Sequence, residues 1–157
     1  MIELTIPSGV ESIVDYAFWR NASLDSITLS DSVTAIGYAA FGHCTSLKRI
    51  VIPDSVTSIG EYAFFRCTSL ERIAIPARVT KIGKNTFSGC TVLASIYIPD
   101  SVTSIDKNAF VDAPNVTIIG SAGSYAQAYA RLNKIPFKAY TASVFEEHFV
   151  LPGDAAA

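Results

Sequence analysis

The sequence predicts an α/β-type repeat solenoid, a fold in which short coils stack and bury continuous ladders of apolar side chains. The first observation behind this fold class is a repeat period of about 23 residues, a length typical of repeat proteins. Residues 52–59 read IPDSVTSI and return letter for letter at residues 98–105, two periods later, and CTSL occurs at both 44–47 and 67–70. The second observation is that 50% of the chain is hydrophobic, an excess that repeated inward-facing ladders explain.

The length and charge of the chain exclude several classes of protein. At 157 residues it is the size of one domain. Only 17% of its residues are charged and its mean hydropathy is +0.35, so it is not intrinsically disordered. No apolar run approaches the ~18–20 residues of a membrane-spanning helix. The net charge of −2 gives no bulk attraction to nucleic acid. We therefore expect neither membrane insertion nor nucleic-acid binding.

Aligned on this period, the chain shows seven columns of apolar residues in phase. Six of them hold mainly Ile, Val, Leu or Ala, and the seventh is aromatic. The aromatic column comprises Phe18, Phe41, Phe64, Phe87 and Phe110. Each column is expected to point inward and to stack on the same position of the next coil.

Each coil has the same predicted parts. The Leu-x-x-Ile-x-Ile segment alternates as a strand does, and strands stacked about 4.8 Å apart form a parallel sheet. Pro ends this strand because it has no N–H to donate. A second extended segment follows at Val-Thr-x-Ile, and Ala-Phe-x-x-Cys is expected to form a single helical turn. Gly37, Gly60 and Gly83 are expected to turn the chain with a positive φ.

The full pattern, I-P-x-S-V-T-x-I-G-x-x-A-F-x-x-C-x-x-L-x-x-I-x-I-P, resembles the BspA-like (bacterial surface-antigen type) leucine-rich repeats from residue 1 to about residue 119. The resemblance implies a curved leucine-rich repeat solenoid with a parallel β-sheet on the concave face and short helical turns opposite. It also implies a bacterial protein at the cell surface or outside the cell, with a role in recognition or adhesion. The end repeats depart from the pattern, with Val14 and Asp106 replacing the turn glycine.

We expect three parts in the chain. Residues 1–119 form the solenoid, with about five coils and no N-terminal cap. Residues 120–140 resemble the C-terminal cap of this family, a helix that begins after Ser121 or Ser124, followed by a short strand. The expected apolar face of this helix comprises Tyr125, Tyr129 and Leu132. Residues 141–157 form a tail, whose apolar side chains, available to dock on the solenoid or a partner, are Phe145, Phe149 and Leu151.

The N-terminal end of this solenoid is open. The chain begins inside the first strand, and the sequence shows no signal peptide. An uncapped solenoid exposes apolar core and an unpaired sheet edge. Two explanations stay open: the chain is a fragment of a longer protein, or the open end pairs with another copy to form a homo-oligomer.

No residue is predicted to be catalytic, to bind a cofactor or to ligate a metal. Cys44, Cys67 and Cys90 follow the repeat and not a metal-binding spacing, so they are predicted to form a buried ladder of free thiols. His43 is expected to face solvent instead of forming a nucleophilic pair with Cys44. Each coil offers one recurrent Asp, too few oxygen ligands for calcium. We therefore expect that the protein is not an enzyme.

Two surfaces are candidate partner-binding sites. On the concave face Arg49 and Arg72 stack on consecutive coils, and Arg and Tyr often anchor protein interfaces. The predicted site on this face comprises Ser26, Thr28, Arg49, Val51, Arg72, Ser95 and Tyr97. A second patch on the helical-turn side comprises Trp19, Arg20, Phe65 and Arg66. The alternatives are a solvated face for the first surface and packing against missing upstream structure for the second.

These features favour a non-enzymatic module that binds a protein or peptide ligand on an extended surface without a deep pocket. The alternative hypothesis is a structural or assembly element that extends or oligomerises through the open N-terminal end.

Overall fold

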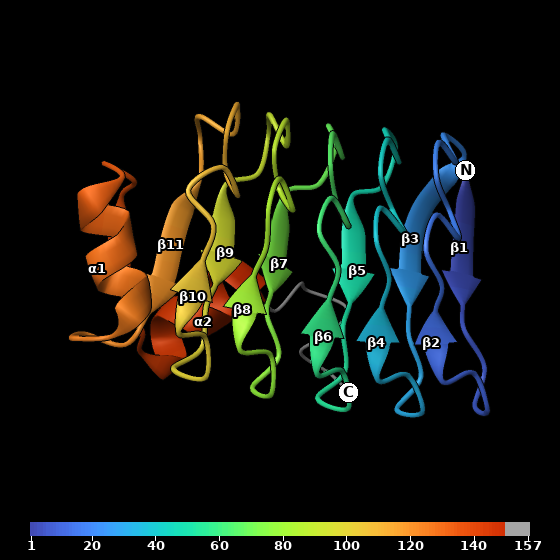
Figure 1. Cartoon of the computed structure of the whole chain (residues 1–157), viewed down its shortest axis with the longest axis horizontal. Helices are drawn as coiled ribbons and strands as arrows, with labels where there is room; N and C mark the ends of the chain where they lie inside the picture. Colours follow the sequence, from blue (N-terminus) through green and yellow to red (C-terminus); the bar gives the residue numbers. More distant parts are fainter. Residues whose placement is uncertain (150–157) are drawn as a thin grey trace.

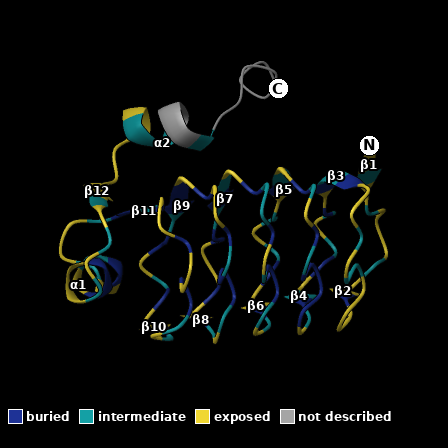
Figure 2. Cartoon of the chain, turned by 90° about the horizontal axis from the view of Figure 1, so that it is seen from above, coloured by how far each residue is buried: buried dark blue, intermediate teal, exposed yellow. Residues whose placement is uncertain are grey.

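The computed structural model describes residues 1–149, apart from the side chains of residues 146–148. Its chain winds into about six coils with two rows of parallel strands on opposite sides (Figures 1 and 2). The first row consists of β1 (Ile2–Thr5), β3 (Leu24–Thr28), β5 (Arg49–Val51), β7 (Arg72–Ala74), β9 (Ser95–Tyr97) and β11 (Thr117–Gly120). The second row consists of β2 (Ser12–Ile13), β4 (Ala35–Ile36), β6 (Ser58–Ile59), β8 (Lys81–Ile82) and β10 (Ser104–Ile105).

Where strands of adjacent coils pair, they run parallel and, apart from a shift between Ile2 and Glu3, keep the register that the repeat predicts. In the first row Leu4 pairs with Ile27, and Ile27 pairs with Ile50. In the second row Ile13 pairs with Ile36. Each pair joins equivalent positions of successive repeats, so the solenoid and its coil length are confirmed.

The aromatic column forms the centre of the core. Adjacent Phe rings from Phe18 to Phe110 stack with centroid distances of 5.3–5.5 Å and interplanar angles of 2–11°. Phe41, Phe64 and Phe87 have no exposed surface, whereas Phe18 in the first coil is only partly buried. The core is thus complete in the middle coils and open at the first one.

Both rows of strands are interrupted at the same place, between the third and fourth coils. Among residues 1–149, β5 does not pair with β7 and β6 does not pair with β8. Most backbone bonds that remain across this interface lie on the turn side, where the N–H groups of Tyr62, Phe64 and Arg66 donate to carbonyls of the fourth coil. We call this interruption of the two rows the seam.

The turns that follow the second row are not helical, which corrects the expectation of helical turns. In the first coil the N–H groups of Ala17 and Trp19 donate to carbonyls three residues earlier, and those of Tyr16 and Phe18 donate to the next coil. Because alternate N–H groups bond to the neighbouring coil, the i to i−4 bonds of an α-helix do not form. Tyr16 and Arg20 also have φ of 60°, which interrupts a right-handed helix.

The expected reason for the turn glycines is also wrong. None of Gly37, Gly60 and Gly83 has a positive φ. A Cβ atom on Gly60 would instead lie 2.6 Å from the carbonyl carbon of Gly37, and a Cβ on Gly37 would lie 2.5 Å from Oδ1 of Asp15. Glycine is needed at Gly37 and Gly60 because adjacent coils approach too closely for a side chain.

Helix α1 (Tyr125–Leu132) packs against β11 at the end of the stack opposite the N-terminus (Figure 1). Ser124 is its N-cap, since the Ser124 side chain accepts a hydrogen bond from the N–H of Gln127 at 3.2 Å. Leu132 was expected on the buried face but is 83% exposed. The buried face instead comprises Ala126, Tyr129 and Ala130. Its two small alanine side chains let the helix approach the last coil closely.

The segment after α1 contains one expected and one unexpected element. Strand β12 (Phe137–Ala139) pairs in parallel with β11, as the predicted short strand does. Helix α2 (Ala142–Phe149) occupies the segment expected to be a tail and lies over the first row of strands (Figure 2). The Thr141 hydroxyl accepts a hydrogen bond from the N–H of Val144 at 3.1 Å, which explains where this helix begins. The prediction for Leu151 falls outside the described residues.

Candidate binding surfaces

Arg49 and Arg72 lie on β5 and β7, on either side of the seam. Both side chains line a hollow of about 280 Å³ on the first row of strands. The other residues around this hollow are Glu3, Asp25, Ser26, Lys48 and Glu71. Lys48 pairs with Asp25 at 3.7 Å, so charges of both signs surround the two arginines. This charged hollow is suited to a polar ligand with charges of its own.

A second, apolar hollow of about 160 Å³ also lies at the seam. Its walls come from β5, β7 and helix α2, and they comprise Arg49, Ile50, Val51, Ile52, Arg72, Ile73, Ala74, Phe145 and Phe149. The two arginines therefore separate a charged hollow from an apolar one. Helix α2 supplies the wall that faces the sheet.

Not every residue of the predicted strand-face site is accessible. Ser95 is buried, with 4% of its surface exposed. The Tyr97 ring lies 5.4 Å from both the Tyr140 and the Phe145 ring centroids, so the chain's own C-terminal segment contacts it. Ser26 and Arg72 stay half-buried, and the exposed members of the predicted site are Thr28 and Val51. Contact with Tyr140 and α2 leaves Tyr97 only partly exposed. The repeat pattern does not predict the position of α2.

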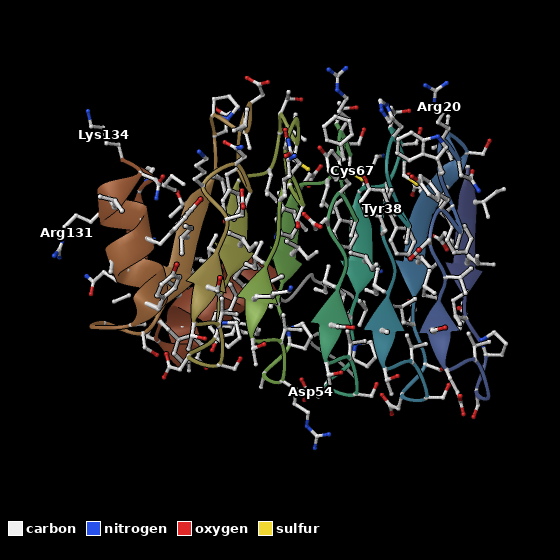
Figure 3. All side chains as sticks on the ribbon, in the orientation of Figure 1. Arg20, Tyr38, Asp54, Cys67, Arg131 and Lys134 are labelled. Carbon is white, nitrogen blue, oxygen red and sulfur yellow. The ribbon has the colours of Figure 1, made fainter. Side chains whose placement is uncertain are left out.

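The second predicted patch belongs to a larger cluster of rings on the turn side of the first three coils. The rings of this aromatic patch are those of Tyr16, Trp19, Tyr38, His43, Tyr62 and Phe65. Neighbouring ring centroids lie 4.8–5.7 Å apart, mostly edge to face. The Arg20 guanidinium lies 5.8 Å from the Trp19 centroid, and that of Arg66 lies 5.4 Å from the Phe65 centroid. Arg20 projects from the edge of the molecule (Figure 3).

His43 was expected to face solvent, but its ring is half-buried within the aromatic patch. Its ring packs between those of Trp19 and Phe65. Partial burial, followed by the charges of Arg20 and Arg66, lowers the pKa of His43. The imidazole is therefore part of the ring stack and does not pair with Cys44.

The three cysteines form the buried ladder that the repeat predicts. All are free and buried. The thiols of Cys44, Cys67 and Cys90 donate hydrogen bonds of 3.1 Å to the carbonyls of Phe18, Phe41 and Phe64. Burial raises the pKa of Cys44 to about 11 and that of Cys90 to about 12. At neutral pH these thiols are protonated and are poor nucleophiles.

Within residues 1–149 no three or more His, Cys, Asp or Glu side chains gather as metal ligands would. In the same part of the chain, neither helix has the length and apolar character needed to cross a membrane.

The coil length, the parallel strands and the apolar ladders define a leucine-rich repeat solenoid, a class of protein that is generally non-enzymatic. The chain matches the model of the BspA type leucine rich repeat region over residues 1–117, in six copies. It therefore belongs to the BspA-type leucine-rich repeat family. No curated protein matches the chain.

Several solved bacterial structures share this fold. The leucine-rich repeat protein of T. pallidum is 35% identical, with a TM-score of 0.72 over 75% of this chain and 58% of that one. A leucine-rich cell surface protein of Faecalibacterium prausnitzii is 38% identical, with a TM-score of 0.76 over 82% of this chain and 34% of that one. The pneumococcal vaccine antigen PcpA, at 20% identity and a TM-score of 0.70 over 88% of this chain and 41% of that one, shares the fold alone. The chain thus spans about a third to three-fifths of these relatives.

Proposed function

We propose that this protein is a non-enzymatic module that binds a protein or peptide ligand at the bacterial cell surface, in recognition or adhesion. The family membership and a relative described as a cell surface protein support this location. The buried, protonated thiols and the ring-packed His43 argue against nucleophilic chemistry by the residues that are its usual agents. The first row of strands is the ligand-facing, concave side in this proposal, and α1 shields the core of the last coil.

The observation that carries the proposal is the position of Arg49 and Arg72 between two hollows of different character. A guanidinium binds a carboxylate through paired hydrogen bonds, and its flat face also tolerates apolar contact. A ligand that spans the seam meets the charged hollow on one side and the apolar hollow on the other. Because Arg49 and Arg72 line both hollows, they would contact such a ligand in each of them.

Phage-displayed peptides selected on the chain test this site. We expect some of the selected peptides to bind the double variant Arg49→Ala, Arg72→Ala at least about tenfold more weakly than the original chain. Arginine is enriched among the interface residues that contribute most to binding. The matched control is Arg78→Ala, Lys81→Ala, which removes the same charge at two exposed positions of the fourth coil. If every selected peptide binds the two double variants equally well, the strand-face site is wrong.

The first coil supports a second candidate function, assembly through the open end of the stack. Leu4 and Phe18 are only partly buried, whereas Ile27 and Phe41, which occupy the same columns one coil later, are 1% and 0% exposed. Stacking a second copy on this coil would bury these side chains and pair the free edge of β1. Light scattering of the chain tests this candidate: we expect an oligomer that Leu4→Lys dissociates, and a monomer at high concentration would contradict it.

A further inference from the structure

One column of the turns places two arginines and a histidine in left-handed backbone. Arg20, His43 and Arg66 occupy the same position of consecutive coils and have φ of 60°, 56° and 57°. The next two coils place Gly89 and Asp112 at this position, with φ of 75° and 60°. Gly and Asp enter the left-handed region at low cost, whereas long side chains do so rarely. Arg20 and Arg66 therefore carry a backbone strain that the later coils reduce, whereas histidine, at position 43, adopts this region more readily.

A neighbouring column repeats the same contrast. Tyr16, Ala39 and Tyr62 have φ of 60°, 52° and 61°, and the fourth coil places Asn85 there with φ of 56°. Asn is another residue that adopts this conformation readily. Ala39 shows that the repeat itself imposes this conformation, so the choice of arginine at positions 20 and 66, where later coils have Gly or Asp, points to a use for the arginine side chains.

The side chains of Arg20, His43 and Arg66 form one continuous strip across three coils, together with two neighbouring aromatic rings. His43 packs between Trp19 and Phe65, while Arg20 lies over the Trp19 ring and Arg66 over the Phe65 ring. The strip therefore has a guanidinium at each end and an imidazole at its centre. We call these five residues the cationic strip.

The guanidinium groups of the strip are not tied up in ion pairs with acidic neighbours among the described residues. Among the described residues neither Arg20 nor Arg66 forms an ion pair. Acidic groups lie at both borders of the strip: Asp15 accepts a hydrogen bond from the N–H of Tyr38 at 2.8 Å, Glu61 lies beside Tyr38, and Asp112 lines a hollow together with Phe65 and Arg66. An anionic ligand therefore meets two available guanidinium groups, and the tyrosine rings border it on one side.

We propose that the cationic strip binds an acidic, proline-containing peptide segment of a partner protein, held in the polyproline II conformation along the axis of the solenoid. Two coil steps separate Arg20 from Arg66, about 10 Å at the usual strand spacing. A polyproline II helix has three residues per turn and a rise of about 3.1 Å, so acidic side chains at i and i+3 share a face and lie about 9 Å apart. This repeat matches the two guanidinium groups.

The rings of the aromatic patch support the same ligand. Surfaces lined by aromatic side chains are the usual docking sites of proline-rich segments in this conformation. A β-strand ligand fits less well, because the side chains on one of its faces recur about every 6.6 Å and do not match two coil steps. The strip is a second surface, separate from the strand face that Arg49 and Arg72 mark.

Fluorescence anisotropy with a labelled peptide of repeated Glu-Pro-Pro tests the proposal. We expect this peptide to bind, a Glu-Gly-Gly repeat of equal charge to bind at least about tenfold more weakly, and a Lys-Pro-Pro repeat not to bind. The double variant Arg20→Ala, Arg66→Ala should lose at least about tenfold in affinity. The Arg78→Ala, Lys81→Ala control and the Arg49→Ala, Arg72→Ala variant should bind as the original chain does.

A further double variant separates ligand binding from folding. Arg20→Asn, Arg66→Gly relieves the backbone strain, so we expect a Tm at or above that of the original chain together with the loss of peptide binding. Equal binding of Glu-Pro-Pro and Lys-Pro-Pro peptides, or full binding by this variant, would overturn the proposal. Binding of polygalacturonate that needs Arg20 and Arg66, with no binding of the peptide, would also overturn it and assign the strip to acidic sugars.

Discussion

Phe64 is the central ring of the stack that runs through the core. It has no exposed surface, and its ring lies 5.4 Å from that of Phe41 and 5.5 Å from that of Phe87. Phe64→Ala should lower the free energy of unfolding by about 3–5 kcal/mol, because it leaves a cavity between two well-packed coils. Urea denaturation measures this change. Phe18→Ala at the partly buried end of the stack should cost clearly less, and equal costs would contradict the ladder.

His43 reports the charge of the cationic strip. Its pKa is lowered by partial burial, then by Arg20 and Arg66, and the rings of Trp19 and Phe65 flank it. NMR titration should show the pKa below the ordinary value of about 6.5, and Arg20→Ala, Arg66→Ala should raise it. An unchanged pKa in the double variant would mean that the guanidinium groups lie elsewhere in solution.

The lowered pKa of His43 also determines how this residue changes the stability of the fold with pH. Because its pKa is lower in the folded state, its contribution to stability is present above the unfolded value of about 6.5. This contribution is lost as the pH falls through the pKa of the folded state, where the imidazole gains a charge beside two guanidinium groups. Carboxylates of a bound peptide would favour the charged imidazole, so peptide affinity should rise as the pH falls below about 6.5.

Individual residues also show which features the sequence predicts and which it does not. The repeat period predicted every buried Phe and Cys because inward columns require apolar side chains. It did not predict left-handed backbone at Tyr16 or Arg20, since these residue types rarely adopt it. It also gave the wrong reason for Gly60, because crowding by Gly37 depends on the stacking distance and not on local turn chemistry.

At the scale of elements, α2 covers the apolar hollow at the seam. Phe145 and Phe149 close this hollow over β5 and β7. Phe145→Ser with Phe149→Ser should therefore release the helix and increase the fluorescence of a bound apolar dye such as ANS. The matched control is Leu132→Ser on α1, which alters a side chain that is already 83% exposed and should leave dye binding unchanged. Equal dye binding by all three proteins would mean that α2 does not cover the hollow.

The strands and helices differ in how well the sequence predicts them. The strands of both rows follow from alternation and from the proline and glycine that bound them, and Ser124 marks the start of α1. Helix α2 lies beyond the repeat and is held by Tyr97 and the seam. The sequence offered the solenoid or a partner as the docking surface for Phe145 and Phe149, and the structure places both against the solenoid, but the helix itself was not predicted.

The whole molecule is a one-dimensional stack, so its stability depends on each interface between neighbouring coils. The aromatic column crosses the seam without interruption, at 5.5 Å between Phe64 and Phe87. Strand pairing does not cross it within residues 1–149. The interface between the third and fourth coils therefore has its core contacts and turn bonds but lacks most of its strand-side hydrogen bonds.

Hydrogen exchange should reveal this weak interface residue by residue. The N–H of Thr57 donates to Thr34 at 2.9 Å and that of Gly60 donates to Ile36 at 2.8 Å, across the interface before the seam. At the seam itself the equivalent N–H groups of Thr80 and Gly83 have no such bond among the described residues. Thr80 and Gly83 should therefore exchange at least about tenfold faster than Thr57 and Gly60, because an unbonded amide needs no local opening.

The same experiment shows whether α2 holds the two halves of the stack together. Since its two phenylalanines line the hollow between β5 and β7, the Phe145→Ser, Phe149→Ser variant should exchange faster throughout the strands beside the seam. The turn-side amides of Phe64 and Arg66, which donate across the seam at 3.0 and 2.8 Å, should keep their protection. Uniform exchange along all coils would show that the seam closes in solution and that the strand rows are continuous.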